Sequence, residues 1–285
     1  MSLATTKRPA PGMSSLVLQM PLLRFWGTTV GLKLVTAFTG VGLTAFVLVH
    51  MLGNLQVFQG AEALDEYGHL LHKEPAVLWG ARLSLLAMVG LHILAFVVLT
   101  RRTLRAQAAA TGGHPRKHRE SSFASRSMRY TGVLLLAFIV YHILHLTTGS
   151  VHPDYHEGSV YANLVSGLRV LPVAIIYVAS MGLLGLHLWH GVWSLFQTLG
   201  FDPGRYNSFG RRFATGFTAV VVAGFMAVPI AVATGVVKPV PAKQADENGR
   251  QFDRAGIGHD VPSPAAASEG KAPAAPAEGR DAPNR

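Results

Sequence analysis

Six histidines lie within long apolar segments or at their ends, where a polar side chain is unfavourable. They are His50, His92, His142, His145, His187 and His190. Ionisable residues inside a membrane are costly and commonly mark functional sites. A neutral imidazole binds metal through one ring nitrogen, and imidazoles from different helices that meet inside a bundle can hold a haem iron between them. The residue types therefore predict haem ligation and electron transfer.

Five apolar segments must position these histidines. Each reaches the roughly 20 residues needed to cross a bilayer, and they are residues 32–55, 77–99, 130–150, 171–195 and 213–236. The chain of 285 residues is 49% hydrophobic and 14% charged, with a mean hydropathy of +0.32. That composition is too apolar for an ordinary soluble domain. We predict an all-α membrane protein, a five-transmembrane-helix bundle with two haems in its interior.

Basic residues set the predicted orientation. Between the second and third segments lie Arg101, Arg102, Arg105, Arg116, Lys117, Arg119, Arg126 and Arg129. Because Lys and Arg favour cytoplasmic loops, the N-terminus is predicted to be cytoplasmic and the C-terminus to lie outside. The net charge of +10 is then a topology signal and does not indicate nucleic-acid binding.

Counting along the segments pairs four histidines by depth. At about 1.5 Å of rise per residue, His50 and His142 reach similar levels near the outside. His92 and His187 reach similar levels nearer the cytoplasm. An iron held by two histidines has no open position for oxygen chemistry, so two stacked haems would form an electron conduit.

His145 and His190 follow better-placed histidines by three residues and so lie near the same helix face. We expect them to bond a haem propionate, a carbonyl or water behind the ligands, and the alternative is that either one replaces its neighbouring histidine as the haem ligand. For intramembrane histidines in general, the alternatives are interhelical hydrogen bonds, a proton relay or a zinc site. Neighbouring glycines fit either close approach of a macrocycle or close helix packing; they are Gly40, Gly42, Gly90, Gly182 and Gly185. Cysteine is absent, which excludes thiolate-ligated haem and iron–sulfur clusters held by this chain.

The predicted organisation has three parts. Residues 1–20 form a flexible N-terminal segment, residues 21–237 the five-helix haem-binding domain, and residues 238–285 a disordered external tail rich in Ala, Pro, Gly and charge. Residues 61–71 predict a short helix at the outer interface, and we expect the same organisation for the loop between the third and fourth segments. No convincing internal repeat is evident.

Four sequence stretches carry a resemblance to a known family. They are LVHMLGNLQVF around His50, GLHILAF around His92, FIVYHILHLTTG around His142 and LHLWHGVWSLFQTLG around His187. Across about residues 20–237 the chain resembles the dihaem cytochrome b membrane-anchor subunit of succinate dehydrogenase and fumarate reductase, in its five-helix single-chain form. The resemblance implies that His50 and His142 ligate the distal haem, and His92 and His187 the proximal haem.

The resemblance also implies partners. This subunit would anchor a flavoprotein and an iron–sulfur subunit to a bacterial cytoplasmic membrane and pass electrons to or from menaquinone or ubiquinone, without acting on succinate itself. Glu74 is a candidate for quinone protonation, and Arg82 for neutralising a haem propionate. Two alternatives stay open: a cytochrome b subunit of a hydrogenase or formate dehydrogenase, and a transporter with a histidine proton relay.

Overall fold

Five long helices dominate the structure, a computed structural model that describes residues 25–111, 123–200 and 207–254. They are α3 (Thr29–Asn54), α5 (Pro75–Thr111), α6 (Phe123–His142), α8 (Leu171–Thr198) and α9 (Asn207–Ala233). Each contains a stretch long and apolar enough to cross a membrane, so the five predicted spans are confirmed. No strand occurs among the described residues. The predicted flexible segment 1–20, the basic residues 116, 117 and 119, and residues 255–285 of the predicted tail lie outside the described residues.

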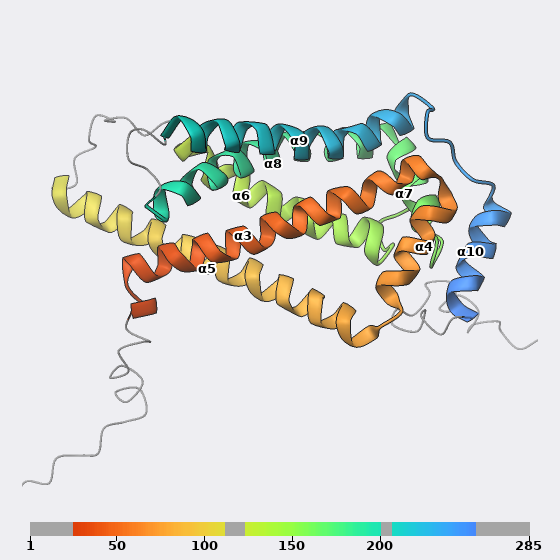
Figure 1. The fold of residues 1–285 in the computed structure, drawn as a ribbon, viewed down its shortest axis with the longest axis horizontal. Helices are drawn as coiled ribbons and strands as arrows, with labels where there is room; N and C mark the ends of the chain where they lie inside the picture. The colour runs from red at the N-terminus through yellow and green to blue at the C-terminus, as the bar shows by residue number, and fades with distance from the viewer. Residues whose placement is uncertain (1–24, 112–122, 201–206, 255–285) are drawn as a thin grey trace, which may run out of the picture.

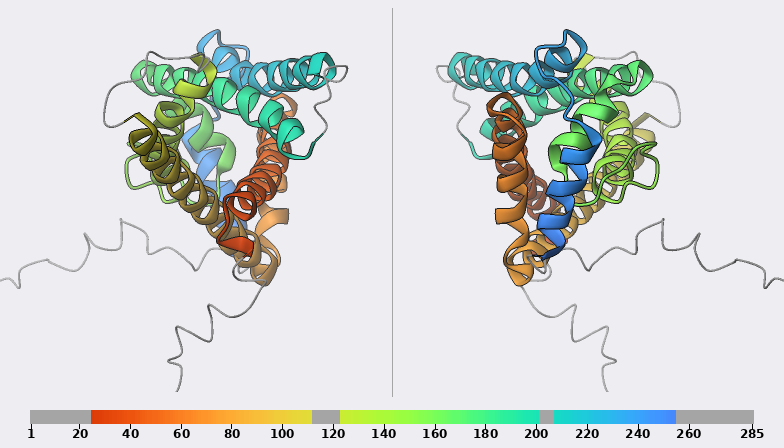
Figure 2. Two further views of the ribbon diagram at one scale, coloured as in Figure 1. Left: turned by 90° about the vertical axis from the view of Figure 1, so that its left-hand side faces the viewer. Right: turned by 90° about the vertical axis from the view of Figure 1, so that its right-hand side faces the viewer.

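The long helices form antiparallel neighbours. α3 packs on α5, α6 packs on α8, and α9 runs along α8 (Figures 1 and 2). Leu188 and Val192 of α8 interlock with Ala214 and Val221 of α9 in a small buried core. The start of α3 is capped by Thr28, whose hydroxyl accepts the backbone N–H of Gly31 at 3.0 Å.

α5 extends well beyond the predicted span. Its 37 residues correspond to roughly 55 Å of helix, against about 30 Å of bilayer hydrocarbon. The extension carries Arg101, Arg102 and Arg105 and projects past the other helices at one end of the bundle (Figure 1). The helix therefore continues into the basic stretch between the second and third apolar segments.

The opposite end, which we call the outer end after the predicted orientation, is closed by short elements. α4 (Ala61–His72) follows η1 (Leu55–Gln59), and α7 (Val160–Arg169) follows the π-helical turn η2 (Ile143–Thr147). The predicted short helix at residues 61–71 is confirmed by α4. α7 is largely buried and packs between the span ends, with Val165 fully buried in a core that includes Tyr177 and Val228. α7 therefore belongs to the buried interior of the outer end, because its apolar side chains face protein on most sides.

The prediction of disorder from residue 238 onward is wrong for Ala242–Arg254, which form helix α10. α10 lies across the outer end (Figure 2), and it turns Ala245, Asn248 and Gly249 toward the body of the protein. Its polar composition cannot form a core, but a helix needs only one short face to dock. The side-chain amide of Asn248 donates a half-buried hydrogen bond to the carboxylate of Asp65 on α4 at 2.7 Å.

Candidate functional site

His92 of α5 and His187 of α8 face each other inside the bundle and form what we call the inner pair. Their ring centroids lie 6.5 Å apart, with 57° between the ring planes. The hydroxyl of Thr39 on α3 lies 3.0 Å from Nδ1 of His92. The hydroxyl of Thr131 on α6 lies 3.2 Å from Nδ1 of His187. Because both Nδ1 atoms are engaged, Nε2 is the nitrogen left to bind a metal.

His50 of α3 and His142 of α6 form the outer pair. Their ring centroids lie 5.8 Å apart, with 81° between the ring planes. A phenylalanine one turn earlier packs against each ring: Phe46 against His50 at 5.4 Å, and Phe138 against His142 at 5.8 Å between centroids. The hydroxyl of Tyr177 lies 3.3 Å from Nδ1 of His142. The ring of His50 has no hydrogen-bond partner within the described part of the chain.

The two pairs lie at two levels of the bundle. On α3, Thr39 at the inner level and His50 at the outer level are eleven residues apart, and this spacing is roughly 16 Å of helix. On α6, Thr131 and His142 have the same separation. The structure thus brings together the same two pairs that counting along the sequence had grouped by depth.

His145 lies beside the outer pair in the π-helical turn η2, and it is fully buried. Its Nδ1 lies 3.0 Å from the hydroxyl of Tyr177, and its ring stacks on Tyr141 and on His152, at 5.4 and 4.7 Å between centroids. A Cβ atom on Gly167 of α7 would lie only 2.6 Å from its Cε1 atom. The partner of His145 is thus a tyrosine hydroxyl and α7 closes over its ring.

His190 lies on α8 one turn beyond the inner pair. Its Nδ1 atom is buried without a hydrogen-bond partner among the described residues. Its ring meets Trp193 edge-on at 6.1 Å, and the guanidinium of Arg211 lies 4.9 Å from the centre of the same tryptophan ring. His190 therefore has an unused donor or acceptor, and both its ring and the Arg211 guanidinium contact Trp193.

Arg82 and Glu74 lie toward the outer end of α5. The guanidinium of Arg82 lies over Trp79, 5.1 Å from the ring centre. Glu74 is exposed, and its backbone carbonyl accepts the N–H groups of Val77 and Leu78 at 3.0 and 3.1 Å, which starts the helix. Within the described residues neither side chain forms a hydrogen bond or ion pair with the outer pair.

The glycines near the histidines divide into two groups. Gly42 and Gly185 serve packing, because a Cβ atom there would meet Met88 and, at 3.0 Å, Val222. A Cβ atom on Gly40 would lie 3.4 Å from His92, whereas Gly90 and Gly182 have nothing within 4 Å. Of these three glycines, only Gly40 lies beside a ring of the inner pair, and Gly90 and Gly182 are exposed.

An internal repeat explains why the histidines pair across the bundle. Residues 39–50 (TGVGLTAFVLVH) and 131–142 (TGVLLLAFIVYH) are identical at seven of twelve positions, and GLH recurs at 90–92 and 185–187. The element order repeats as well: a long helix, a 3₁₀ or π turn, a short helix and a second long helix. The interpretation that no repeat is present is therefore wrong. Each pair joins equivalent positions of the two halves.

Asp65 of α4 ties the outer end together, and it is only 3% exposed. Its carboxylate accepts the backbone N–H of Tyr161 at the start of α7, at 2.8 Å, and the side-chain amide of Asn248 of α10, at 2.7 Å. Burial raises the pKa of this carboxyl above its ordinary 3.8, and those two hydrogen bonds oppose the rise. One buried acid therefore joins α4, α7 and α10.

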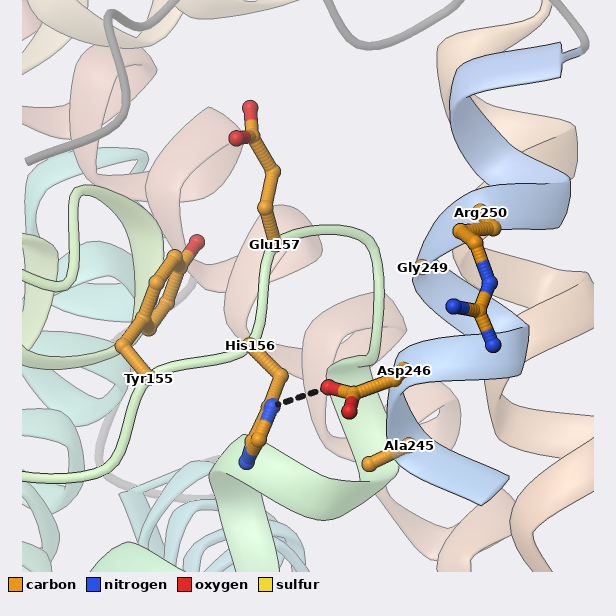
Figure 3. Close-up of a pocket in the computed structure, with 7 residues that line it drawn as sticks. All are labelled: Tyr155, His156, Glu157, Ala245, Asp246, Gly249 and Arg250. Carbon is orange, nitrogen blue, oxygen red and sulfur yellow. Dashed lines mark hydrogen bonds and ion pairs between the residues drawn. The ribbon is translucent and has the colours of Figure 1, made fainter. Parts of the chain in front are cut away.

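A polar pocket of about 350 Å³ lies between α10 and the loop that precedes α7 (Figure 3). Nδ1 of His156 lies 3.0 Å from Oδ1 of Asp246 across it. Its lining contains no histidine of either pair; it consists of Tyr155, His156, Glu157, Ala245, Asp246, Gly249 and Arg250. It is a surface feature of the outer end, separate from the paired histidines.

The sequence reasoning missed three residues that hold the paired rings: Thr39, Thr131 and Tyr177. The signal for the threonines was present, because in both repeats a Thr-Gly precedes the outer histidine by eleven residues. Tyr177 has no equivalent signal, because the matching position in the first repeat, ten residues before His92, is Arg82.

Comparison with known proteins gives one family. Residues 102–228, a little under half of the chain, match the family model described as succinate dehydrogenase/fumarate reductase transmembrane subunit. The matched part includes His142 and His187, one member of each pair. No curated protein matches the chain, and no solved structure does.

Proposed function

We propose that this chain belongs to the succinate dehydrogenase/fumarate reductase transmembrane subunit family, whose model matches residues 102–228, and that its inner and outer pairs hold two b-type haems. Through these haems the chain passes electrons between a partner iron–sulfur subunit and a membrane quinone. A flavoprotein of the same complex acts on succinate or fumarate. The complex resides in a bacterial cytoplasmic membrane, with the N-terminus of this chain inside.

The meeting of four histidines from four helices in two pairs carries the proposal. Imidazole nitrogens bind metals at about 2 Å, and the ring centre lies about 1 Å behind the nitrogen, so two imidazoles on one metal have centroids roughly 6 Å apart. The observed separations of 5.8 and 6.5 Å fit that arrangement. No group of three or more His, Cys, Asp or Glu side chains in the described residues is placed to hold a metal ion. A structural zinc site takes four ligands and a catalytic one three, so pairs of histidines fit haem better.

The surroundings of the pairs fit a flat macrocycle. A Cβ atom on Gly40 would lie 3.4 Å from Cε1 of His92, and one on Gly132 would lie 3.7 Å from Cε1 of His187, so the absence of side chains there lets a flat group approach the helix backbone. When bound, each haem supplies a one-electron carrier whose potential depends on its axial ligands and their hydrogen bonds. The chain itself fixes the ligand rings and excludes water from them by placing them within membrane spans.

The repeat suggests a role for Arg82 at the outer haem. Arg82 occupies the place in the first repeat that Tyr177 occupies in the second, ten residues before the inner histidine of its helix. Tyr177 contacts the outer pair, so Arg82 lies at the level where a haem propionate would need a cation. Glu74, exposed at the same end, is the candidate group for exchanging protons with quinone.

A reduced-minus-oxidised absorption spectrum of the purified complex tests the proposal. We expect a b-type α-band that titrates as two components, each equal to one haem per chain. A complex without any α-band would leave the histidines as a proton relay and overturn the proposal. Co-purification of a flavin-containing succinate-oxidising protein is the second expectation, and recovery of a hydrogenase or formate dehydrogenase instead would overturn the assignment of partners.

A further inference from the structure

We infer that Thr39 and Thr131 are positioning residues, which keep a proton on Nδ1 of each inner histidine and so present Nε2 as the ligand atom. The inference rests on the proposed haem at the inner pair and deepens it. It concerns residues of this chain that lie one step behind the ligands, on helices that supply no ligand at this level.

The single proton of the Thr39 hydroxyl decides the direction of its hydrogen bonds. Oγ1 of Thr39 lies 2.7 Å from the carbonyl oxygen of Val35 and 3.2 Å from that of Thr36. Carbonyl oxygens only accept, so the hydroxyl donates to them, as helical threonines commonly do. Its oxygen then accepts from His92, whose Nδ1 must carry the proton. The ring is thereby fixed with a free lone pair on Nε2.

Thr131 repeats this arrangement at the second ring. Its Oγ1 lies 3.0 Å from the carbonyl oxygen of Ser127 and 3.3 Å from that of Met128, and 3.2 Å from Nδ1 of His187. Thr39 is 8% exposed and Thr131 is 3% exposed, so bulk water does not compete for either contact. The same contact between a threonine hydroxyl and Nδ1 of a histidine therefore occurs at equivalent positions of the two repeats.

The glycine after each threonine gives the ring its place. A Cβ atom on Gly40 would lie 3.4 Å from Cε1 of His92, and one on Gly132 would lie 3.7 Å from Cε1 of His187. The Thr-Gly pair thus offers a hydrogen-bond acceptor and a flat backbone surface side by side. Such outer contacts orient a ligand ring and raise its basicity, which favours the oxidised iron.

The test uses Thr39→Val and Thr131→Val in the purified complex, since valine replaces the hydroxyl with a methyl group of similar size. Redox titration at the α-band should show the midpoint potential of one haem, the inner one, moved to a more positive value in either variant. The outer haem of the same sample serves as an internal control and should titrate as in the wild type. Thr39→Ser and Thr131→Ser, which restore the hydroxyl, should restore the wild-type midpoint.

Thr234→Val is the matched control variant. Thr234, an exposed residue just after the end of α9, makes the same two backbone contacts, at 2.9 Å to Ile230 and 3.3 Å to Ala231, and the structure gives it no histidine contact. It should leave both midpoints unchanged. If both valine variants fail to assemble while both serine variants and Thr234→Val assemble, the hydroxyls of Thr39 and Thr131 are needed for more than their backbone contacts. That result supports their contact with the histidine rings.

Unchanged midpoints in assembled Thr39→Val and Thr131→Val complexes would overturn the inference. Equal shifts in the serine and valine variants would do so too, because serine keeps the hydroxyl, so the shift would then come from disturbed packing at these positions. Failure of the proposed function looks different: the wild-type complex itself would lack an α-band.

Discussion

At the inner level the two histidines are held alike, and at the outer level they are not. His92 and His187 each meet a threonine hydroxyl, at 3.0 and 3.2 Å, from the equivalent turn of the two repeats. At the outer level only His142 has a hydroxyl partner, Tyr177, while His50 stacks on Phe46 and lies 6.0 Å from Phe225 of α9. The two repeats share the histidine positions at both levels and the preceding phenylalanine at the outer level, but they share hydroxyl partners only at the inner level.

The difference follows from what closes each end. The outer end carries α4, α7 and α10, and the buried His145 and His152 link the outer pair to that protein cap through Tyr177. The inner pair depends only on the long helices themselves. We therefore expect substitutions in the cap, formed by α4, α7 and α10, to affect the outer haem. Substitutions in the pairs Thr39-Gly40 and Thr131-Gly132 should affect the inner haem.

The largest effect should come from removing the ligands. His92→Ala and His187→Ala should each abolish the same spectral component, the inner haem, because both rings belong to one site. His50→Ala and His142→Ala should each abolish the other component. Redox-resolved spectra of the four purified variants measure this. If the two variants of one pair lost different spectral components, the assignment of those two histidines to one haem would be wrong.

A smaller effect should follow from a substitution that forces α7 of the cap away from His145, which lies beside the outer pair. In Gly167→Ala the new methyl group would lie 2.6 Å from Cε1 and 2.9 Å from Nε2 of the buried His145. The stacked rings cannot yield easily, so we expect a cost toward the upper part of the about 1–3 kcal/mol typical of overpacking. Thermal scans should show earlier loss of the outer haem, with the inner haem little changed.

Gly216→Ala on α9 is the control for Gly167→Ala, because nothing lies within 4 Å of a Cβ atom there. It should be neutral or stabilise the helix by up to about 1 kcal/mol. Equal loss of both haems in Gly167→Ala would mean that α7 supports the whole bundle rather than the outer level.

The spans and the paired histidines could be predicted from the sequence. A long apolar stretch indicates a membrane span, and a histidine within such a stretch is unfavourable unless it has a function. Thr39 could not be predicted, because a helical threonine bonded to its own backbone is ordinary until a histidine from another helix is placed beside it. α10 could not either: its composition predicts disorder, and its docking depends on Asp65, which lies 183 residues from Asn248.

Tyr177→Phe should sharpen the contrast between the levels with a smaller change. It removes the hydroxyl that lies 3.3 Å from His142 and 3.0 Å from His145, and two buried nitrogens lose their partner at a cost of about 1–3 kcal/mol. The loss of an acceptor for His142 should move the outer midpoint potential to a more positive value. Redox titration checks this, and a shift of the inner haem instead would contradict the assigned levels.

The smallest effect should be the pH response of the cap. Burial raises the folded-state pKa of Asp65 above 3.8, so between 3.8 and that raised value the folded cap binds more protons than the unfolded one. Its stability should therefore fall as pH rises through this window and stay at the lower level above it. Asp65→Asn, whose side-chain oxygen can still accept from Tyr161, should remove this dependence. Hydrogen exchange of α7 and α10 amides over about pH 4 to pH 7, wild type against variant at each pH, measures it. α8 amides near His187 serve as the control, and parallel profiles in wild type and variant would show that Asp65 does not set the response.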